Sequence, residues 1–308
     1  MQALAVALAY ESPDQTIRSA DPATRLRRAA NLTGVELSRR GTLFALLVPG
    51  LAVLLFGFLY PVAATLAFPP DGDPATVARE TGSLLTDPYL LPVIARTIRV
   101  AVVTTLICLV LGFPVAYLIS RVPPRWSGKL LALAIFPLML NTVVRTYGWL
   151  VVLGGNGLLS SLTEGLGLGP SRLLYTETAI VLGLVQLFLP LMILSCYSSL
   201  SQQDPRLEEA ARGLGASPGR AFRQVVFPLA LPGALVGCTL VFAGAVTAFT
   251  TPQLLGGARE RILSTLLYSR VNVSLDWPAA SAVALVMTVL VLVVSALSSR
   301  LSAKGSTQ

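Results

Sequence analysis

The sequence predicts an all-α integral membrane protein with six transmembrane helices and both termini on the cytoplasmic side. Three observations predict it: the composition, six long apolar runs, and the distribution of the basic residues. Of the 308 residues, 54% are hydrophobic and 12% are charged, whereas soluble domains carry about 25% charged residues. One soluble core of this length cannot bury so much apolar surface, so a lipid bilayer is the expected solvent.

The apolar runs follow a polar arm at residues 1–40, which carries six arginines and is expected to lie in the cytoplasm. Each run is close to the ~20 residues that cross ~30 Å of hydrocarbon as a helix. Prolines within the runs are compatible with this, because neighbouring membrane helices can satisfy the freed backbone groups. We expect the spans at residues 42–67, 97–120, 130–153, 178–200, 231–255 and 279–299.

The basic residues set the orientation. With the N-terminus inside, the inner segments carry 15 Lys and Arg residues and the outer segments carry seven. Since cytoplasmic loops are enriched in Lys and Arg, this split favours both termini inside. It also accounts for most of the net charge of +8 without a nucleic acid partner.

The longest inner loop, at residues 201–230 between spans four and five, has the signals of a short helix that ends in a glycine turn. Asp204 supplies a side-chain oxygen at the N-cap, and Pro205 follows at the first helical position, where its missing N–H costs nothing. The helix is expected to run to about Leu214. Gly215 can then take the left-handed conformation that a helix C-terminus needs.

The same signals restart a second helix at Ser217 and Pro218, and we expect Pro228 to mark the junction with span five. In the first helix, Glu208 and Glu209 lie near the positive end of the helix dipole. Its small residues leave one side nearly flat, so that another backbone can approach: Ala210, Ala211 and Gly213. From the residues alone, docking on a partner and resting at the membrane surface are both open.

The spacing within this loop resembles the signature of binding-protein-dependent ABC importer permeases. That family pattern is Glu-Ala-Ala, then Gly, then Ile-x-Leu-Pro, and here the loop has 209–211 as Glu-Ala-Ala, Gly215, and 225–228 as Val-Val-Phe-Pro. Val225 and Phe227 depart from the pattern but keep an apolar helix face. The resemblance extends over about 41–300.

Two local patterns look most like the polyamine (spermidine/putrescine) branch of that family. One is Val-Arg-Thr-Tyr-Gly-Trp at 144–149 in span three, and the other is Asp-Trp-Pro at 276–278 before span six. The branch also contains permeases for other small organic solutes, and the loop carries more weight than these patterns.

The resemblance implies a transmembrane domain over residues 41–302 with the MetI-like type I importer fold, in the bacterial inner membrane. The inner loop would form a coupling helix in a groove of a cytoplasmic ATPase, and two such ATPases would bind the ATP and Mg²⁺. A rigid-body movement would then switch the pore between inward and outward access. A periplasmic binding protein would deliver the solute, and a second permease, usually a different but related chain, would complete the pathway. The residues expected to couple to the ATPase are Glu208, Glu209, Ala210, Ala211, Gly213, Gly215 and Pro228.

Span three contains Arg145, the one charge well inside a span. Such a charge normally faces a cavity or a partner, although Arg145 is also near enough to the outer end to extend toward the interface. Asn141 lies four residues earlier and is expected on the same helix face. In span five, threonines near Phe249 either line the pathway or bond their own helix backbone. The candidate path residues are Asn141, Arg145, Tyr147, Trp149, Thr247, Phe249 and Thr250.

The sequence gives less support to a proton-coupled carrier or to an enzyme. No Asp or Glu lies in any expected span, which argues against a proton relay and leaves cation selectivity mainly to the binding protein. The two lysines are not in a phosphate-binding loop, so this chain is not expected to hydrolyse ATP. The sequence has no His, and its three cysteines lie in apolar runs, so neither a metal site nor a catalytic constellation is expected. The alternative is a secondary carrier or channel that works without ATP.

Overall fold

The computed structural model describes residues 47–60, 74–88, 90–155, 157–165, 173–204 and 206–305, and all regular structure in these ranges is helical. The chain divides into two units, Met1–Ala64 and Thr65–Gln308. In the first unit, the described part is the apolar helix Leu47–Gly57, which passes into a π-turn (η1, Leu55–Leu59). The rest of the predicted first span and the N-terminal arm lie outside the described residues.

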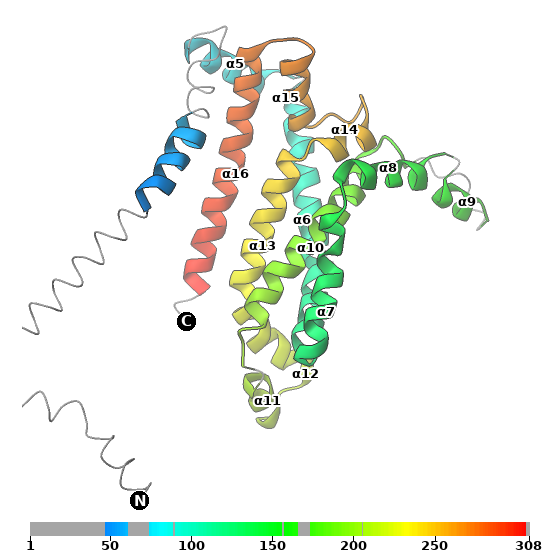
Figure 1. The fold of residues 1–308 in the computed structure, drawn as a ribbon, viewed down its shortest axis with the longest axis vertical. Coiled ribbons are helices and arrows are strands. Elements are labelled where there is room, and N and C mark those ends of the chain that lie inside the picture. Colours follow the sequence, from blue (N-terminus) through cyan, green and yellow to red (C-terminus); the bar gives the residue numbers. More distant parts are fainter. Residues whose placement is uncertain are drawn as a thin grey trace, which may run out of the picture. The chain divides into compact units, whose positions relative to one another are not determined.

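The second unit is built around three long helices that pack on one another: α6 (Leu91–Arg121), α10 (Glu177–Leu200) and α13 (Phe227–Thr247) (Figure 1). A fourth, α16 (Trp277–Gly305), packs against α13. Within the described residues, four helices are long and apolar enough to cross a membrane, or five if one bent pair is counted as a span. Span two begins six residues earlier than predicted, at Leu91.

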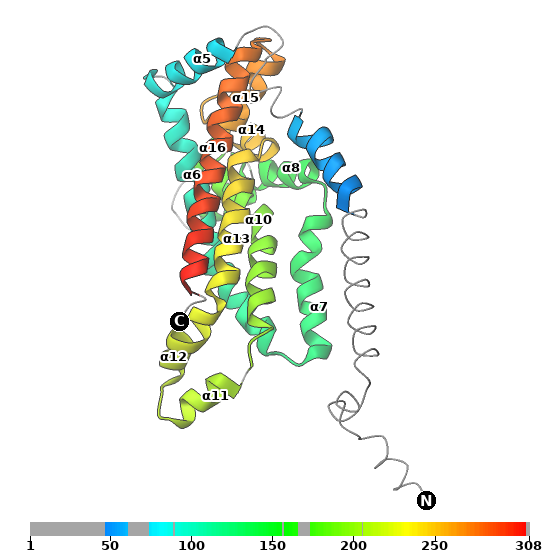
Figure 2. The ribbon, with the colours of Figure 1, turned by 90° about the vertical axis from the view of Figure 1, so that its left-hand side faces the viewer.

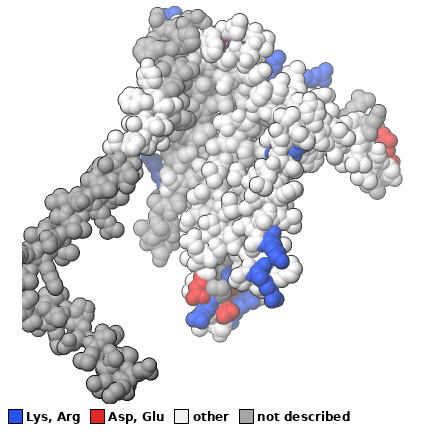
Figure 3. All heavy atoms as spheres, in the orientation of Figure 1, with Lys and Arg blue, Asp and Glu red and all other residues white. Residues whose placement is uncertain are grey.

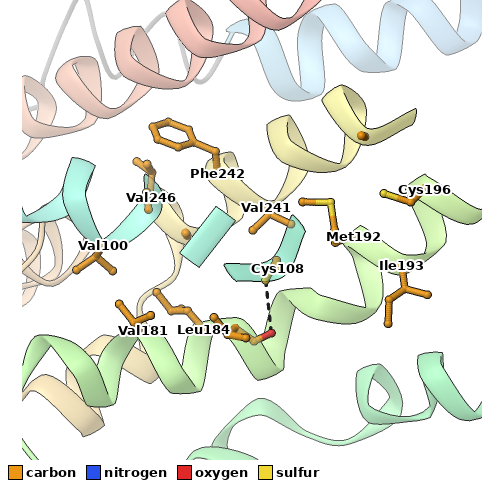
Figure 4. Packing of buried hydrophobic residues seen from close by; sticks show 14 of the residues in the cluster. Val100, Cys108, Val181, Leu184, Met192, Ile193, Cys196, Val241, Phe242 and Val246 are labelled. Carbon is orange, nitrogen blue, oxygen red and sulfur yellow. Dashed lines mark hydrogen bonds between the residues drawn. The ribbon is translucent and has the colours of Figure 1, made fainter. Parts of the chain in front are cut away.

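The core lies where α6, α10 and α13 meet (Figure 4). Small residues are frequent there, and they let the helix backbones approach closely, as is typical of membrane bundles. Cys108 and Cys196 are buried, and Cys108 Sγ lies 3.7 Å from the carbonyl oxygen of Val185. The cysteines therefore serve as small packing residues. Other deeply buried members of the core are Val100, Leu184, Met192, Val241 and Val246.

Predicted span three, at 130–153, is not one continuous helix. The chain forms α7 (Pro124–Ile135), a 3₁₀ turn (η2, Phe136–Met139) and then α8 (Thr142–Leu153). The segments on either side of the break are bent by 87° (Figure 2). The physical reason lies in two residues: Pro137 cannot donate a backbone hydrogen bond, and the side chain of Asn141 caps a new helix by accepting from the N–H of Val143 at 2.8 Å.

Predicted span five also differs. The helix is unbroken from Pro218 to Thr247, then ends, and α14 (Thr250–Gly256) follows. Pro228 lies at the start of α13, where the prediction placed the junction with span five, although the helix is not interrupted there. A π-turn (η3, Phe222–Val226) precedes it, so that Pro228 falls in the first turn of the α-helical register of α13, where a missing N–H is tolerated.

The shorter helices lie at the two ends of the bundle. At one end lie α5 (Pro74–Thr86), α8, α14 and α15 (Leu263–Asn272), and α5 packs against α16 (Figures 1 and 2). At the opposite end lies α11 (Arg206–Gly213), which belongs to the inner loop of the sequence. The bundle therefore separates the predicted coupling loop from the outer half of predicted span three.

Candidate coupling loop and translocation path

The inner loop has the predicted order of helix, glycine turn and helix. Asp204 Oδ1 accepts a hydrogen bond of 2.9 Å from the N–H of Arg206, which satisfies one of the free donors at the start of α11. The helix ends at Gly213, one residue from the predicted position. Gly215 follows with φ of +90°, the left-handed region that only glycine enters at little cost. This turn was confirmed in position and in conformation.

The glycine turn closes the end of α11 by two backbone hydrogen bonds. The N–H of Gly215 donates to the carbonyl of Arg212 at 3.0 Å, and the N–H of Ala216 donates to the carbonyl of Ala211 at 3.1 Å. Both satisfy carbonyls that the helix leaves free. The direction in which the chain leaves α11 is therefore fixed by this one turn.

The second helix of the loop, α12 (Pro218–Ala221), begins after Ser217 as predicted, although the serine side chain makes no capping hydrogen bond. The N–H of Ala221 donates to the Ser217 carbonyl at 2.9 Å. Phe222 then packs edge-on against Tyr117 and Phe113 of α6, with ring centroids 5.2 and 5.9 Å apart. These aromatic contacts join the second half of the loop to the bundle.

The two neighbouring glutamates of α11 point in different directions. Glu209 is exposed, whereas only 7% of Glu208 is exposed. Both carboxylate oxygens of Glu208 accept from Tyr117 Oη at 3.1 Å. One oxygen also pairs with Arg121 and the other with Arg212, each at 2.7 Å. Of the two predicted coupling glutamates, Glu209 is the exposed one, and it borders the pocket that α11 forms with Tyr117 and Arg121.

Four more of the predicted coupling residues lie on α11, and Gly215 and Pro228 follow in the turn and in α13. Glu209, Ala210 and Gly213 are exposed and Ala211 is half-buried. Beside them stands Leu214, which is 91% exposed. Arginine side chains gather around the tip of the loop, on the same end of the molecule (Figure 3): Arg206, Arg212, Arg220 and Arg223. Small exposed residues and one projecting leucine, bordered by charged side chains, therefore occupy α11 and its turn.

The candidate path residues of span three lie at and beyond the break. Asn141 serves as the cap of α8, so it does not share a helix face with Arg145 as predicted. The Arg145 guanidinium turns back toward the break and donates to the Pro137 carbonyl at 2.9 Å. Tyr147 is 55% exposed, and Trp149 donates from Nε1 to Gln186 Oε1 of α10 at 3.0 Å.

The candidates of span five lie at the break between α13 and α14. Thr247 donates to the Ala243 carbonyl of its own helix at 2.9 Å, which is the alternative that the sequence left open. Phe249 stacks on Tyr268 of α15, with ring centroids 4.4 Å apart. Thr250 is half-buried at the start of α14. Since α8 and α14 pack together, the structure brings the two sets of candidates to one end of the bundle.

Sequence reasoning missed a cleft of about 700 Å³, here called the polar cleft, between the ends of α10 and α13 nearest α11; half of its lining residues are polar and half are apolar. Among the described residues that line it, Asp204 is the only charged one. Its other polar members are Ser195, Ser198, Ser199, Gln202 and Gln203. Serines at i, i+3 and i+4 share one helix face, and this stripe in an otherwise apolar run was a signal that the sequence contained.

Within the described ranges, no group of three or more His, Cys, Asp or Glu residues is arranged to hold a metal ion. The fold defines a multi-pass membrane subunit with a helical loop at one end.

The comparisons with known proteins agree with this class. The family described as "Binding-protein-dependent transport system inner membrane component" matches residues 108–304. The spermidine/putrescine transport system permease protein PotB of Haemophilus influenzae is 37% identical over 251 residues, which cover 80% of this chain and 85% of that protein. PotB of Escherichia coli is 35% identical over 207 residues, covering 67% and 75%.

Solved structures show the same fold. A chain of a bacterial alginate ABC transporter, in complex with a periplasmic protein bound to an alginate pentasaccharide, superposes with a TM-score of 0.72 at 16% identity. That match covers 87% of this chain and 96% of the other. A chain of the inward-facing MetNI methionine ABC transporter gives a TM-score of 0.55 at 18% identity, covering 70% and 95%.

The chain belongs to the family of binding-protein-dependent inner membrane transport components. It is the permease subunit of an ATP-driven importer and a transport subunit rather than an enzyme. The MetI-like fold inferred from the loop signature is confirmed.

Proposed function

We propose that this permease imports a polyamine-type small organic cation delivered by a periplasmic binding protein. The observation that carries the proposal is the 37% identity to a spermidine/putrescine permease over most of both chains. The polar cleft supports it, since hydroxyl, amide and carboxylate oxygens accept hydrogen bonds from ammonium groups. Asp204 is the only charged residue among the described residues of its lining, so that lining presents no cation to repel a polyamine.

In this proposal the pathway runs from the outer candidates on α8, α13 and α14 to the polar cleft at the inner ends of α10 and α13. A second permease, a related but different chain, would close the open side of the cleft. Six spans with both termini in the cytoplasm would place α11 on the inner side. Two cytoplasmic ATPases, which bind ATP and Mg²⁺, would each receive one coupling helix, and the permease itself would need no cofactor.

The docking of α11 on an ATPase is supported by its exposed small-residue face. Glu209, Ala210, Gly213 and Leu214 are accessible on one turn of the loop, and Gly215 fixes the direction in which the chain leaves the helix. A rigid element with an exposed apolar residue can transmit a rigid-body movement without first being ordered.

The test is transport in proteoliposomes that contain the purified complex, its binding protein and labelled spermidine or putrescine. We expect uptake that requires ATP, and we expect the ATPase subunit to co-purify with this chain. Uptake that survives ATP depletion would instead support a secondary carrier. Calorimetry on the binding protein identifies the cargo: binding of an anionic or neutral solute in place of a polyamine would refute the cation proposal while leaving the importer function intact.

A further inference from the structure

We infer that Glu208 is a positioning residue that fastens the coupling helix to α6, and that α6 carries the movement of that helix to the outer end of the bundle. The inference rests on the proposed docking of α11 on an ATPase. It goes beyond that docking because Glu208 faces away from the docking surface.

The burial pattern of α11 sets Glu208 apart. All residues of this helix are described, and its only buried residue is Glu208. Leu207 is 49% exposed and borders the cleft beside α10 and α13, and α11 also contacts η3 and α12. An isolated eight-residue helix is marginal in water, so its orientation depends on such contacts, and those of Glu208 are the buried ones that join it to α6.

Those contacts lead to the inner end of one helix. Tyr117 and Arg121 both belong to α6, and together they bind both oxygens of the Glu208 carboxylate. Arg121 also lies over the ring of Tyr117, with its guanidinium carbon 5.2 Å from the centroid. Arg212 completes the cluster from α11 itself. A buried carboxylate with two cationic partners resists separation, because removing one partner leaves an uncompensated charge.

The opposite end of α6 is held by a second cluster. Arg96 Nε pairs with Glu177 of α10 at 3.0 Å and with Glu260 at 2.9 Å. Arg96 Nη1 also donates to the backbone carbonyls of Arg259 and Arg261, at 3.3 Å each. The outer end of α6 is therefore bound to the turn that joins α14 to α15, beyond the break where the outer path candidates lie.

Between the clusters, α6 is one helix of 31 residues, which corresponds to a length of roughly 46 Å. It contains Pro114, one turn before Tyr117, yet it remains a single helix, whereas the segments on either side of the α7–α8 break are bent by 87°. A continuous helix fastened by ion pairs at both ends transmits a displacement of one end to the other. The arrangement thus links the coupling loop to the outer turn through Glu208, Arg121 and Arg96.

The experiment measures ATP hydrolysed per solute transported, with the complete complex in proteoliposomes. For Glu208→Gln and for Arg121→Gln we expect this ratio to rise about tenfold or more, since breaking a buried charge pair costs more than the free energy of a tenfold change. The ATPase subunit should still co-purify, because Glu209 and the docking face are unchanged. Glu208→Asp retains the carboxylate and is expected to show a smaller rise.

Exchanging the charges of Glu208 and Arg121 distinguishes a loss of helix positioning from general damage to the fold. The double variant Glu208→Arg with Arg121→Glu restores an attractive pair between the same two positions, and it should bring the ratio back toward the wild type. Glu164→Gln on α9 (Leu158–Gly165) and Arg125→Gln on α7 are matched controls, since both side chains are exposed and lie outside these clusters. Their ratios should equal that of the wild type.

Arg96→Gln tests the second half of the inference at the far end of α6. We expect it to raise the ratio in the same way, although it touches no part of the coupling loop.

A wild-type ratio in Glu208→Gln, or a charge exchange no better than the single variants, would overturn the role of Glu208. Loss of the ATPase from Glu208→Gln would show a docking residue instead. A wild-type ratio in Arg96→Gln would overturn transmission through α6, and absence of ATP-driven uptake in the wild type would refute the proposed function as well.

Discussion

The inner loop around α11 and the outer segment around the start of α8 are both short helices that begin after a capping residue. In the inner loop, Asp204 caps α11 and Gly215 ends it, and the structure has both features where the sequence predicts them. In the outer segment, Asn141 caps α8 in the same manner, yet the sequence predicts a continuous span there.

The difference lies in the surroundings of the two signals. The inner loop is polar, so each cap and turn residue stands out against its neighbours. The outer segment is apolar on both sides of Pro137 and Asn141, and proline is common in membrane helices. Hydropathy reports that a segment is in contact with apolar surroundings, but it does not report the direction of the chain. An Asn that closely follows a proline turn therefore predicts a helix N-cap in an apolar run as it does in a polar loop.

The largest effect on transport is expected at Gly215, where the backbone conformation of the turn is essential. Gly215→Val should abolish transport while leaving membrane insertion intact. A β-branched residue at φ of +90° costs about 1–3 kcal/mol, although no atom would lie within 4 Å of its Cβ. The strain is relieved by changing the direction in which the chain leaves α11, so the docking face is misplaced.

The measurement is solute uptake together with the amount of chain in the membrane fraction. Gly128→Val on α7 is a matched control, since Gly128 has open space around it and no positive φ. That variant should transport at the wild-type rate. Wild-type uptake by Gly215→Val would contradict a coupling role for the loop.

The coarse fold and the helix–glycine turn of the loop followed from the sequence because both depend on local properties. Apolar run length predicts membrane helices, and cap and turn residues predict the loop. The role of Glu208 did not follow, because its partner Arg121 lies 87 residues away and was counted only as one more cytoplasmic charge. The link between Trp149 and Gln186 is of the same kind. Contacts between distant residues depend on helix packing, which neither composition nor periodicity encodes.

The two ends of the molecule also differ in helix packing, since α10 and α13 approach closely at the edge of the polar cleft whereas the segment around Gly148 is open. A Cβ on Gly233 of α13 would lie 2.4 Å from Ser199 Cβ and 2.8 Å from the Ser195 carbonyl oxygen of α10, whereas a Cβ on Gly148 of α8 would meet no atom within 4 Å. Gly233→Val should therefore destabilise the fold by about 1–3 kcal/mol, because α10 and α13 must move apart.

Thermal unfolding of the purified chain in detergent, followed by size-exclusion chromatography, measures this difference. The unfolding midpoint should fall for Gly233→Val and stay near the wild-type value for Gly148→Val. Equal midpoints would show that the two regions do not differ in packing.

The smallest effect is expected at Arg145, whose guanidinium donates to the Pro137 carbonyl at the break, beside the N–H of Leu140 that donates to the same oxygen. A hydrogen bond to a charged group contributes about 1.5–3 kcal/mol, and here it stabilises the turn between α7 and α8. Arg145→Ala should reduce uptake several-fold with normal expression.

Arg145→Lys separates two causes: a charge lining the path would be retained by Lys, whereas the reach and geometry of the guanidinium would not. Recovery of uptake in Arg145→Lys would therefore assign Arg145 to the path, and persistence of the defect would assign it to the turn. Unchanged uptake in Arg145→Ala would remove it from both roles.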